Sequence, residues 1–423
     1  MKNMLQTFKL YALAILTIAH ARLFNYMARC GLVLGANTLT NIIPTLYEAL
    51  DIVSREMVGF IPAVTRDSSA ARAAKDENIN IPIVPAVAAA DITPGVTAPD
   101  SGDQVLGNTV MTISKSRMVP VRWNGEETVG VTNSGLYPSV NAQRFAQAMR
   151  TLCNEVEADL ADLHQYASRA YGTATGTPFA TANDLSDNAA MLQILEDNGA
   201  PTVDLHAVLS SSLIANIRGK QSVLFKVNES GTDQLLRRGV IGEMQGAMVH
   251  SSAQIKRPAA GTNNGSATTT AAGFPIGTTN IATAAAGTGT IVAGDIITFA
   301  GDTNKYLVTV GVANVASAST ALVIAEPGLR QAIPASATVI TTIAQTKRSM
   351  YFDRSAIALV TRAPAMPEGG DQADDVIEIV DSISGLAFQV AMYRQYRQVH
   401  YEVGLAWGVK AIAPRHIAVL IGA

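Results

Sequence analysis

Six histidines are the residues best suited to bind a metal ion or to act as a general base. They are far apart in the sequence, at His20, His164, His206, His250, His400 and His416. Metal sites usually draw at least two ligands from closely spaced positions, and no two of these histidines have such a spacing on one expected element. The sequence therefore predicts packed or surface histidines and no metal site.

Two pairs of neighbouring carboxylates, Glu126–Glu127 and Asp374–Asp375, have the residue types of a general acid and base. Adjacent residues on a strand point to opposite faces, so we interpret both pairs as solvated side chains. Gly287-x-Gly289 lies in a tract of small residues and does not introduce a helix, so it is not a phosphate loop. The nucleophile-elbow, Walker, zinc-protease and Cys-x-x-Cys patterns are also absent from the sequence. We therefore expect no catalytic residue, no cofactor and no enzyme activity.

Composition limits the remaining classes of function. The 423-residue chain is long enough for two or three domains, and its formal charge of −3 gives no basic field typical of nucleic-acid binding. Charged residues make up only 15% of the chain, while Ala, Thr, Gly and Val are abundant. This balance suits a protein that buries much of its surface against copies of itself. The two cysteines, Cys30 and Cys153, indicate no disulfide framework and favour a reducing compartment.

One long amphipathic helix, expected over residues 139–171, must organise the chain. Ser139 is a suitable N-cap after Pro138, and Gly172 is a natural stop. Apolar residues recur every three or four positions along one stripe: Phe145, Met149, Leu152, Val156, Leu160, Leu163, Ala167 and Ala170. The charged residues are expected mostly elsewhere on the helix surface: Glu155, Glu157, Asp159, Asp162 and Arg169.

Residues 1–40 form an N-terminal extension with three open interpretations. Lys2 and Lys9 precede an apolar run, and Ala19-His20-Ala21 has the form of a signal-peptidase site. The alternatives are an ordered arm, or a natural start at Met27. Residues 41–79 follow as a helix over 41–60, with Pro44 near its start, and a polar connection.

Residues 80–128 are expected to form a long β-hairpin. Its arms are residues 79–84 and 110–123, and a tract rich in Pro, Gly and Asp separates them. A two-stranded arm is marginally stable alone, so a neighbouring subunit would support it. The long helix belongs to the next segment, residues 129–184.

The remainder divides into three segments. Residues 185–252 are mixed, with a helix over 185–198, a strand over 203–209 and a helix over 211–218. Residues 253–345 read as an inserted small all-β unit, since a low-complexity tract is followed by short strands separated by turn residues. Strand and helix patterns resume over residues 346–423.

This order of parts resembles the major capsid proteins of tailed phages with the HK97-like fold. Within that group it looks most like the coat proteins of short-tailed Salmonella phages, which carry an inserted immunoglobulin-like or telokin-like domain. The resemblance covers about residues 36–423. It is carried by residues 90–123, by residues 246–252 with 354–364, and by residues 293–301.

The resemblance implies an α+β fold in which each segment has a mechanical role. Residues 80–128 would be the extended loop, residues 129–184 the peripheral domain, and residues 185–252 with 346–423 the axial domain. Subunits of this kind assemble with themselves as pentamers and hexamers of an icosahedral shell, in the host cytoplasm. Their partners are a scaffolding protein, a portal protein, packaged double-stranded DNA without sequence specificity, and in some cases a decoration protein. A procapsid expands when the DNA is packaged, and the mature protein is found in the virion. Some relatives join a loop lysine to an asparagine of a neighbouring subunit. Lys115 lies on the expected hairpin, but one lysine is no evidence for such a crosslink, and we expect none here.

Two alternatives remain open. An encapsulin-type nanocompartment shares the fold but encloses an enzyme, and the inserted β unit favours the phage shell over it. A secreted or surface β-rich protein explains the N-terminus better and the long helix worse.

Overall fold

The computed structural model describes residues 43–56, 59–83, 94, 107–133, 137–221, 242–367, 369–380 and 385–422. The N-terminal extension, the tip of the expected hairpin and residues 222–241 lie outside the described residues. No helix in the described part is long and apolar enough to span a membrane.

The fold is mixed α+β, as predicted. The helices are α2 (Ile43–Glu56), α3 (Gly125–Asn133), α4 (Tyr137–Asp162), α5 (Ser186–Asp197) and α6 (Ser211–Lys220). Short 3-10 turns are η2 (Ile61–Ala63), η3 (Leu163–Tyr166), η5 (Arg354–Ala356) and η6 (Pro414–His416).

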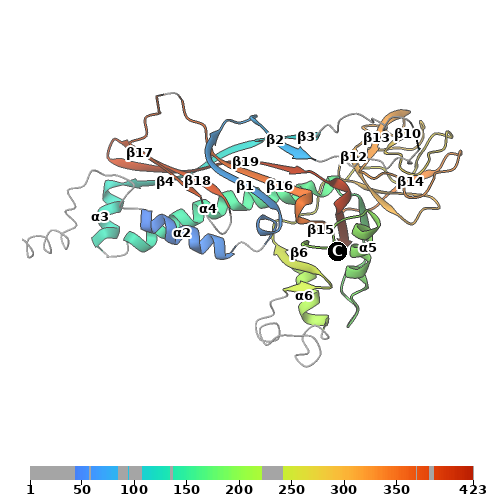
Figure 1. Cartoon of the computed structure of the whole chain (residues 1–423), viewed down its shortest axis with the longest axis horizontal. Coiled ribbons are helices and arrows are strands. Elements are labelled where there is room, and N and C mark those ends of the chain that lie inside the picture. Colours follow the sequence, from blue (N-terminus) through green and yellow to red (C-terminus); the bar gives the residue numbers. More distant parts are fainter. Residues whose placement is uncertain are drawn as a thin grey trace, which may run out of the picture. The chain divides into compact units, whose positions relative to one another are not determined.

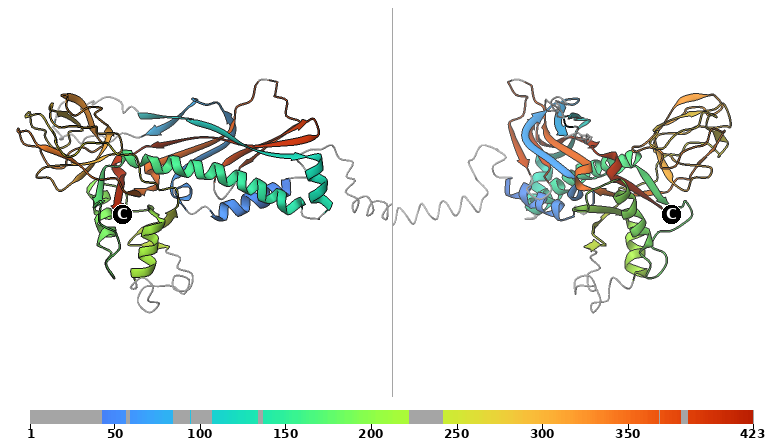
Figure 2. Two further views of the ribbon diagram at one scale, coloured as in Figure 1. Left: turned by 180° about the vertical axis from the view of Figure 1, so that it is seen from behind. Right: turned by 45° about the vertical axis from the view of Figure 1, so that its right-hand side comes forward.

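Six strands form one sheet in the order β1-β16-β19-β18-β17, with β4 on the other side of β19. Their bounds are β1 (Thr65–Ala73), β4 (Lys115–Asn124), β16 (Ile357–Pro364), β17 (Asp375–Val380), β18 (Ala387–Gln395) and β19 (Gln398–Ala411). The fourteen residues of β19 are long enough to pair with β4 along one edge and with β18 and then β16 along the other. The long helix α4 packs on β4 and β19, and Figure 2 shows it running along this sheet.

A twelve-stranded sheet contains the remaining strands apart from one hairpin. Its order is β7-β8-β6-β15-β20-β5-β12-β11-β14-β9, and β13 joins β12 to β10 (Figure 1). The first part comprises β5 (Arg169–Gly172), β6 (Leu205–Ser210), β7 (Glu243–Met244), β8 (Ala247–Ser252), β15 (Lys347–Asp353) and β20 (Ile417–Gly422). The second part comprises β9 (Ala267–Thr268), β10 (Asn280–Thr283), β11 (Ile296–Phe299), β12 (Lys305–Val310), β13 (Ser319–Ile324) and β14 (Val339–Thr342).

The stripe of α4 is confirmed from Phe145 to Leu160, because each of its apolar residues in that range is fully buried. The predicted end of the helix is wrong. The chain leaves the α-helix after Asp162, and residues 169–172 form β5 between β20 and β12. Ala167 and Ala170 continue the helical spacing in the sequence and are buried, but strand pairing with β20 determines their conformation.

The expected hairpin over 80–128 is also only partly right. Its base exists as β2 (Asn78–Ile83) paired with β3 (Gly107–Thr112), and this pair forms its own two-stranded sheet. The second arm breaks at Ile113 and Ser114, after which β4 pairs with β19 over ten residues. The alternation in residues 110–123 therefore belongs to two strands of different sheets, and Glu126–Glu127 lie in the first turn of α3 rather than on a strand.

Most other elements lie where the sequence predicted them. The helix pattern expected within residues 346–423 is wrong, because the described residues there form the strands β15–β20 and only the 3-10 turns η5 and η6. The helix predicted over 41–60 is α2, and its apolar residues Leu46, Ala49, Leu50 and Val53 are buried. Helices α5 and α6 and strand β6 lie where the periodicity predicted them. Between β8 and β15 the described elements are all strands, with a hydrophobic cluster of their own. These strands are joined to β5 through β12, so they continue the same sheet as β5, β20 and β15.

Candidate functional site: the carboxylates of the long helix

The sequence predicted no catalytic or ligand-binding residue. Within the described residues, no group of three or more His, Cys, Asp or Glu side chains is arranged to hold a metal ion. The structure instead draws attention to two carboxylates of α4, Glu157 and Asp159. Two positions along a helix turn the side chain by about 200°, so the two residues face opposite sides of α4.

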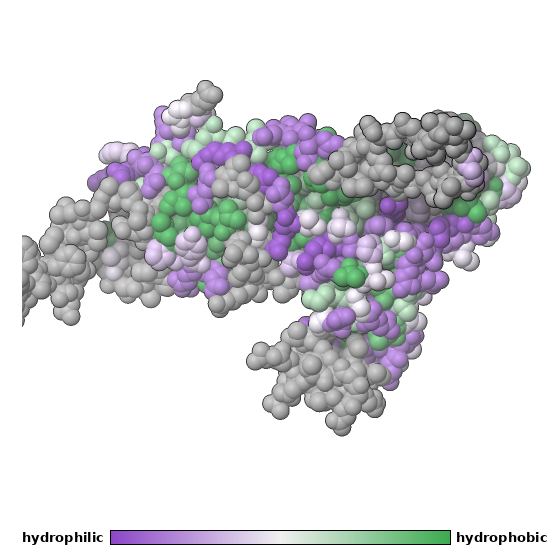
Figure 3. Space-filling view, in the orientation of Figure 1, coloured by the Kyte–Doolittle hydropathy of each residue, from purple (hydrophilic) through white to green (hydrophobic). Residues whose placement is uncertain are grey.

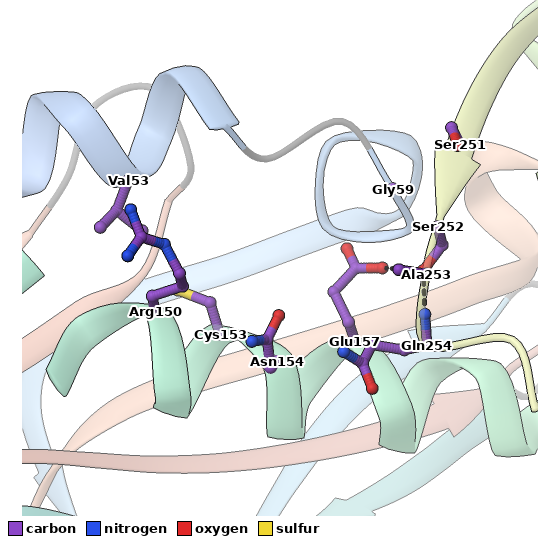
Figure 4. A pocket seen from close by; sticks show the side chains of 10 residues that line it. All are labelled: Val53, Gly59, Arg150, Cys153, Asn154, Glu157, Ser251, Ser252, Ala253 and Gln254. Carbon is purple, nitrogen blue, oxygen red and sulfur yellow. Dashed lines mark hydrogen bonds between the residues drawn. The ribbon is translucent and has the colours of Figure 1, made fainter. Parts of the chain in front are cut away.

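Glu157 is buried, with 7% of the residue exposed, which corrects its expected place on the surface. Its Oε2 accepts hydrogen bonds from the Phe60 N–H at 2.9 Å and the Ser252 hydroxyl at 3.0 Å. Its Oε1 accepts one from the Ile61 N–H at 2.8 Å. Figure 4 shows the carboxylate reaching from α4 towards the chain at Gly59 and the end of β8.

The two backbone donors are the N–H groups of Phe60, the N-cap of η2, and of Ile61, its first residue, and the N-cap side chain makes no hydrogen bond to the turn. Such N–H groups lack partners within a helix, so Glu157 caps η2 from another element. Gly59 permits this contact, because a Cβ at that position would lie 2.3 Å from Oε2. Glu157 thus joins α4, the segment after α2, and β8.

Burial raises the pKa of Glu157, and the three hydrogen bonds lower it by less. The three donors, two backbone N–H groups and a hydroxyl, are all neutral. A cavity of about 310 Å³ lies alongside, lined by Val53, Gly59, Arg150, Cys153, Asn154, Glu157 and residues 251–254 (Figure 4). The Glu157 carboxylate therefore holds three segments of the chain together through neutral hydrogen-bond donors.

Asp159 makes a different joint on the other side of α4. Its Oδ1 lies 2.6 Å from Lys115 Nζ, and its Oδ2 accepts a hydrogen bond from Trp407 Nε1 at 2.8 Å. Lys115 and Trp407 are opposite each other in the β4–β19 ladder. Asp159 therefore fixes α4 to both strands at one point of the six-stranded sheet.

Lys115, the lysine of the expected hairpin, takes part in this joint. Its ammonium group is engaged within the chain by Asp159 and lies 6.0 Å from the centre of the Trp407 ring. The geometry of Lys115 is that of an internal ion pair.

The structure brings together two histidines that the sequence left apart. His206 Nδ1 lies 3.0 Å from His250 Nε2, and His206 Nε2 lies 3.0 Å from Asp204 Oδ1. The neighbouring parallel strands β6 and β8 bring the pair together, and no spacing rule within one element could have found it. Burial, and then the charge of Arg354, lower the pKa of His206.

A third polar cluster lies where the strands β9–β14 meet the rest of the fold. Asp295 is fully buried and accepts hydrogen bonds from the Val292 N–H at 2.8 Å and from Gln345 Nε2 at 2.6 Å. The Gln345 carbonyl in turn accepts from the buried guanidinium of Arg348. Burial lowers the pKa of Arg348 to about 10.

Comparison with known proteins gives similarities in structure alone. No protein-family model and no curated protein matches the chain. A solved chain of a Mycobacterium phage is 13% identical, with 86% of this chain and 91% of that chain covered and a TM-score of 0.42. The capsid of the cyanophage P-SCSP1u is 10% identical over 87% of this chain and 88% of that chain, with a TM-score of 0.44. A virus-like particle from Pyrococcus furiosus is 9% identical over 89% and 98%, with a TM-score of 0.39.

Proposed function

We propose that this chain is the major capsid protein of a tailed double-stranded DNA bacteriophage, with an HK97-like fold. Copies of it assemble into the icosahedral head shell and are part of the virion. Its role is structural rather than enzymatic.

The observation that carries this proposal is the arm formed by β2 and β3. These strands pair with each other over six residues and with no other strand that the structure describes. One face of the arm packs on the six-stranded sheet through the buried Met111 and the partly buried Ile79 and Ile81. The other face presents Asn78, Asn80 and Val110 to solvent. A two-stranded ribbon gains little stability from its own pairing, and a second copy of the chain lying over the exposed face would stabilise it further.

The helix α4 supplies the rigid element that a shell subunit needs. Its buried stripe, Glu157 and Asp159 fix it to parts of both large sheets, so a load applied to one sheet is passed to the other. Repeated contacts between identical subunits close into a shell when the same heterologous contact recurs around an axis.

The finer assignments belong to the same proposal. Residues 80–128 act as the extended loop, residues 129–184 as the peripheral domain, and residues 185–252 with 346–423 as the axial domain. Residues 253–345 act as an inserted immunoglobulin-like domain, which the separate cluster of Phe299, Tyr306, Leu322 and their neighbours supports. A scaffolding protein, a portal protein, packaged DNA and a decoration protein are the partners that follow from the resemblance in sequence.

Sedimentation velocity of the purified chain tests the role of the arm. We expect wild-type protein to sediment as particles of many subunits. Thr109→Pro removes the N–H donor of a β3 residue that pairs with Ile81, and it should leave free subunits whose thermal unfolding is close to that of the wild type. Thr109→Val keeps the donor and is the matched control.

Normal particles from Thr109→Pro would contradict the role given to the arm. Nucleic acid inside the wild-type particles would favour the phage head, and a protein cargo would favour the encapsulin-type compartment.

A further inference from the structure

An apolar groove lies between α3 and the tip of the β18–β19 hairpin. Its volume is about 520 Å³, and its walls are Trp123, Asn124, Gly125, Thr128, Val129, Arg394, Gln395 and residues 397–399. Val129 is 59% exposed on one wall, and Tyr396 is 90% exposed at the hairpin tip beside it. The Gly125 N–H donates to the Arg397 carbonyl at 3.1 Å, so the two walls are fixed to each other.

Arginines surround this groove. Arg144 stacks on Trp123 with its guanidinium carbon 3.8 Å from the ring centre, and its Nη1 donates to the Arg122 carbonyl. Arg394 lies 3.4 Å from Asp374, while Arg397 is exposed and has no ion-pair partner among the described residues. Glu126 and Glu127 are the acidic residues nearby, and Glu127 accepts a hydrogen bond from the Asn124 N–H. Arg394 and Arg397 line the groove and Arg144 covers Trp123, so three guanidinium groups lie at its edge.

The exposed face of α2 has the complementary character. Tyr47 is 55% exposed and Ile52 is 37% exposed, although the opposite face of the helix is buried. Glu48 and Asp51 lie between them, and positions 47, 48, 51 and 52 fall within about 140° of one another around a helix. This face combines a tyrosine and an isoleucine with the exposed carboxylate of Glu48, while Asp51 is half-buried. A tyrosine at the centre of a contact is a frequent source of binding energy.

Both surfaces belong to the same chain, but each is exposed to solvent. Apolar side chains are also visible on this part of the molecule, over the area that Figure 1 labels β4 and β18 (Figure 3). A surface with an apolar centre and an arginine rim matches an apolar helix face that carries carboxylates.

We propose that the groove between α3 and the β18–β19 tip receives the α2 face of a second copy of this chain. Tyr47 and Ile52 enter the groove, while the exposed Glu48 meets the arginine rim. The contact is heterologous, because each copy offers a different surface to each of two neighbours, and contacts of this kind build rings and closed shells. This inference rests on the proposed shell function and names one contact within it.

Charge exchange tests the contact. Arg397→Glu and Glu48→Arg change exposed residues, so thermal unfolding of each variant should stay near the wild-type value. Each single change should raise the protein concentration needed for assembly about tenfold, and the double variant should restore most of the loss. Lys220→Glu makes the same charge change on exposed α6, away from both surfaces, and should assemble like the wild type.

The possible results separate this contact from the function itself. Unchanged assembly of both single variants, or a loss that the double variant fails to restore, would overturn the contact while leaving the shell function intact. An effect of Arg397→Glu seen only when a second protein is added would also overturn it, because the groove would then receive another protein. A wild-type chain that forms no particles would refute the proposed function instead.

Discussion

Glu157 and Asp159 are two residues apart on α4, yet they hold the helix by different physical means. Glu157 is buried and is bound by two backbone N–H groups and a hydroxyl, all of them neutral. Asp159 has a side chain 15% exposed and meets a lysine, itself 37% exposed, together with an indole N–H. Removing a buried acceptor leaves its donors without partners, whereas a partly exposed ion pair competes with water and salt. The comparison therefore predicts a large and salt-independent contribution from Glu157 and a smaller, salt-dependent one from Asp159.

The largest expected effect is that of Glu157→Ala. The Phe60 and Ile61 N–H groups and the Ser252 hydroxyl lose their acceptor in a buried site, so the free energy of unfolding should fall by about 3–5 kcal/mol. Urea unfolding of dissociated subunits measures this. Glu155→Ala is the matched control on the same helix, because the Glu155 side chain is 40% exposed and 3.7 Å from Arg117. For Glu155→Ala we expect the free energy of unfolding to fall by less than about 0.5 kcal/mol. Equal losses in the two variants would contradict the special role of Glu157.

Acid should weaken the end of α4 through His164 in η3. Burial lowers the pKa of His164 to about 4 from an ordinary value of 6.5. Its contribution to stability is therefore complete above pH 6.5 and is lost as the pH falls towards 4, a decrease of about 3 kcal/mol.

The pKa shift of Glu157 makes stability change with pH in the opposite direction. Because its pKa is raised from 4.5, its contribution is complete below pH 4.5 and is lost as the pH rises through the pKa of the folded state. Urea unfolding between pH 4 and 8 measures both slopes. The slope due to His164 should vanish in His164→Gln, and that due to Glu157 in Glu157→Gln. A wild-type slope retained in His164→Gln would remove His164 from this account.

Gly59→Ala tests how closely the backbone at residue 59 approaches the Glu157 carboxylate. The new methyl group would overlap Oε2, and we expect a loss of about 1–3 kcal/mol in the free energy of unfolding. The same change made in Glu157→Ala should cost much less, because the obstructing carboxylate is gone. A double-mutant cycle by urea unfolding measures this coupling, and strictly additive losses would show that the two residues do not meet.

The smallest effect is expected for Asp159→Asn. The variant keeps an oxygen that can accept from Trp407 but loses the charge that attracts Lys115, so a loss of about 1 kcal/mol or less is expected. Unfolding at low and at high salt provides the check. The difference in unfolding free energy between the variant and the wild type should shrink at high salt. A difference that does not depend on salt would contradict the assignment of Asp159 to a partly exposed ion pair.

The elements set by local spacing could be predicted from the sequence, while those set by distant partners could not. The periodicity of Phe145 to Leu160 placed α4, and the turn residues placed the strands β11–β14. The end of α4 depends on Ser168, which hydrogen bonds to the Ile417 carbonyl 249 positions away. The burial of Glu157 likewise depends on η2 and β8, which lie about 95 residues on either side. A charged residue on a helix looks solvated in the sequence, and only the tertiary fold shows which donors surround it.

Electron microscopy of the purified wild-type chain, after separation by size, tests the central claim most directly. The account predicts closed shells of uniform diameter, or irregular shells and tubes when no scaffold is supplied. A monodisperse monomer or small oligomer, both alone and with scaffold-like proteins from neighbouring genes, would contradict it.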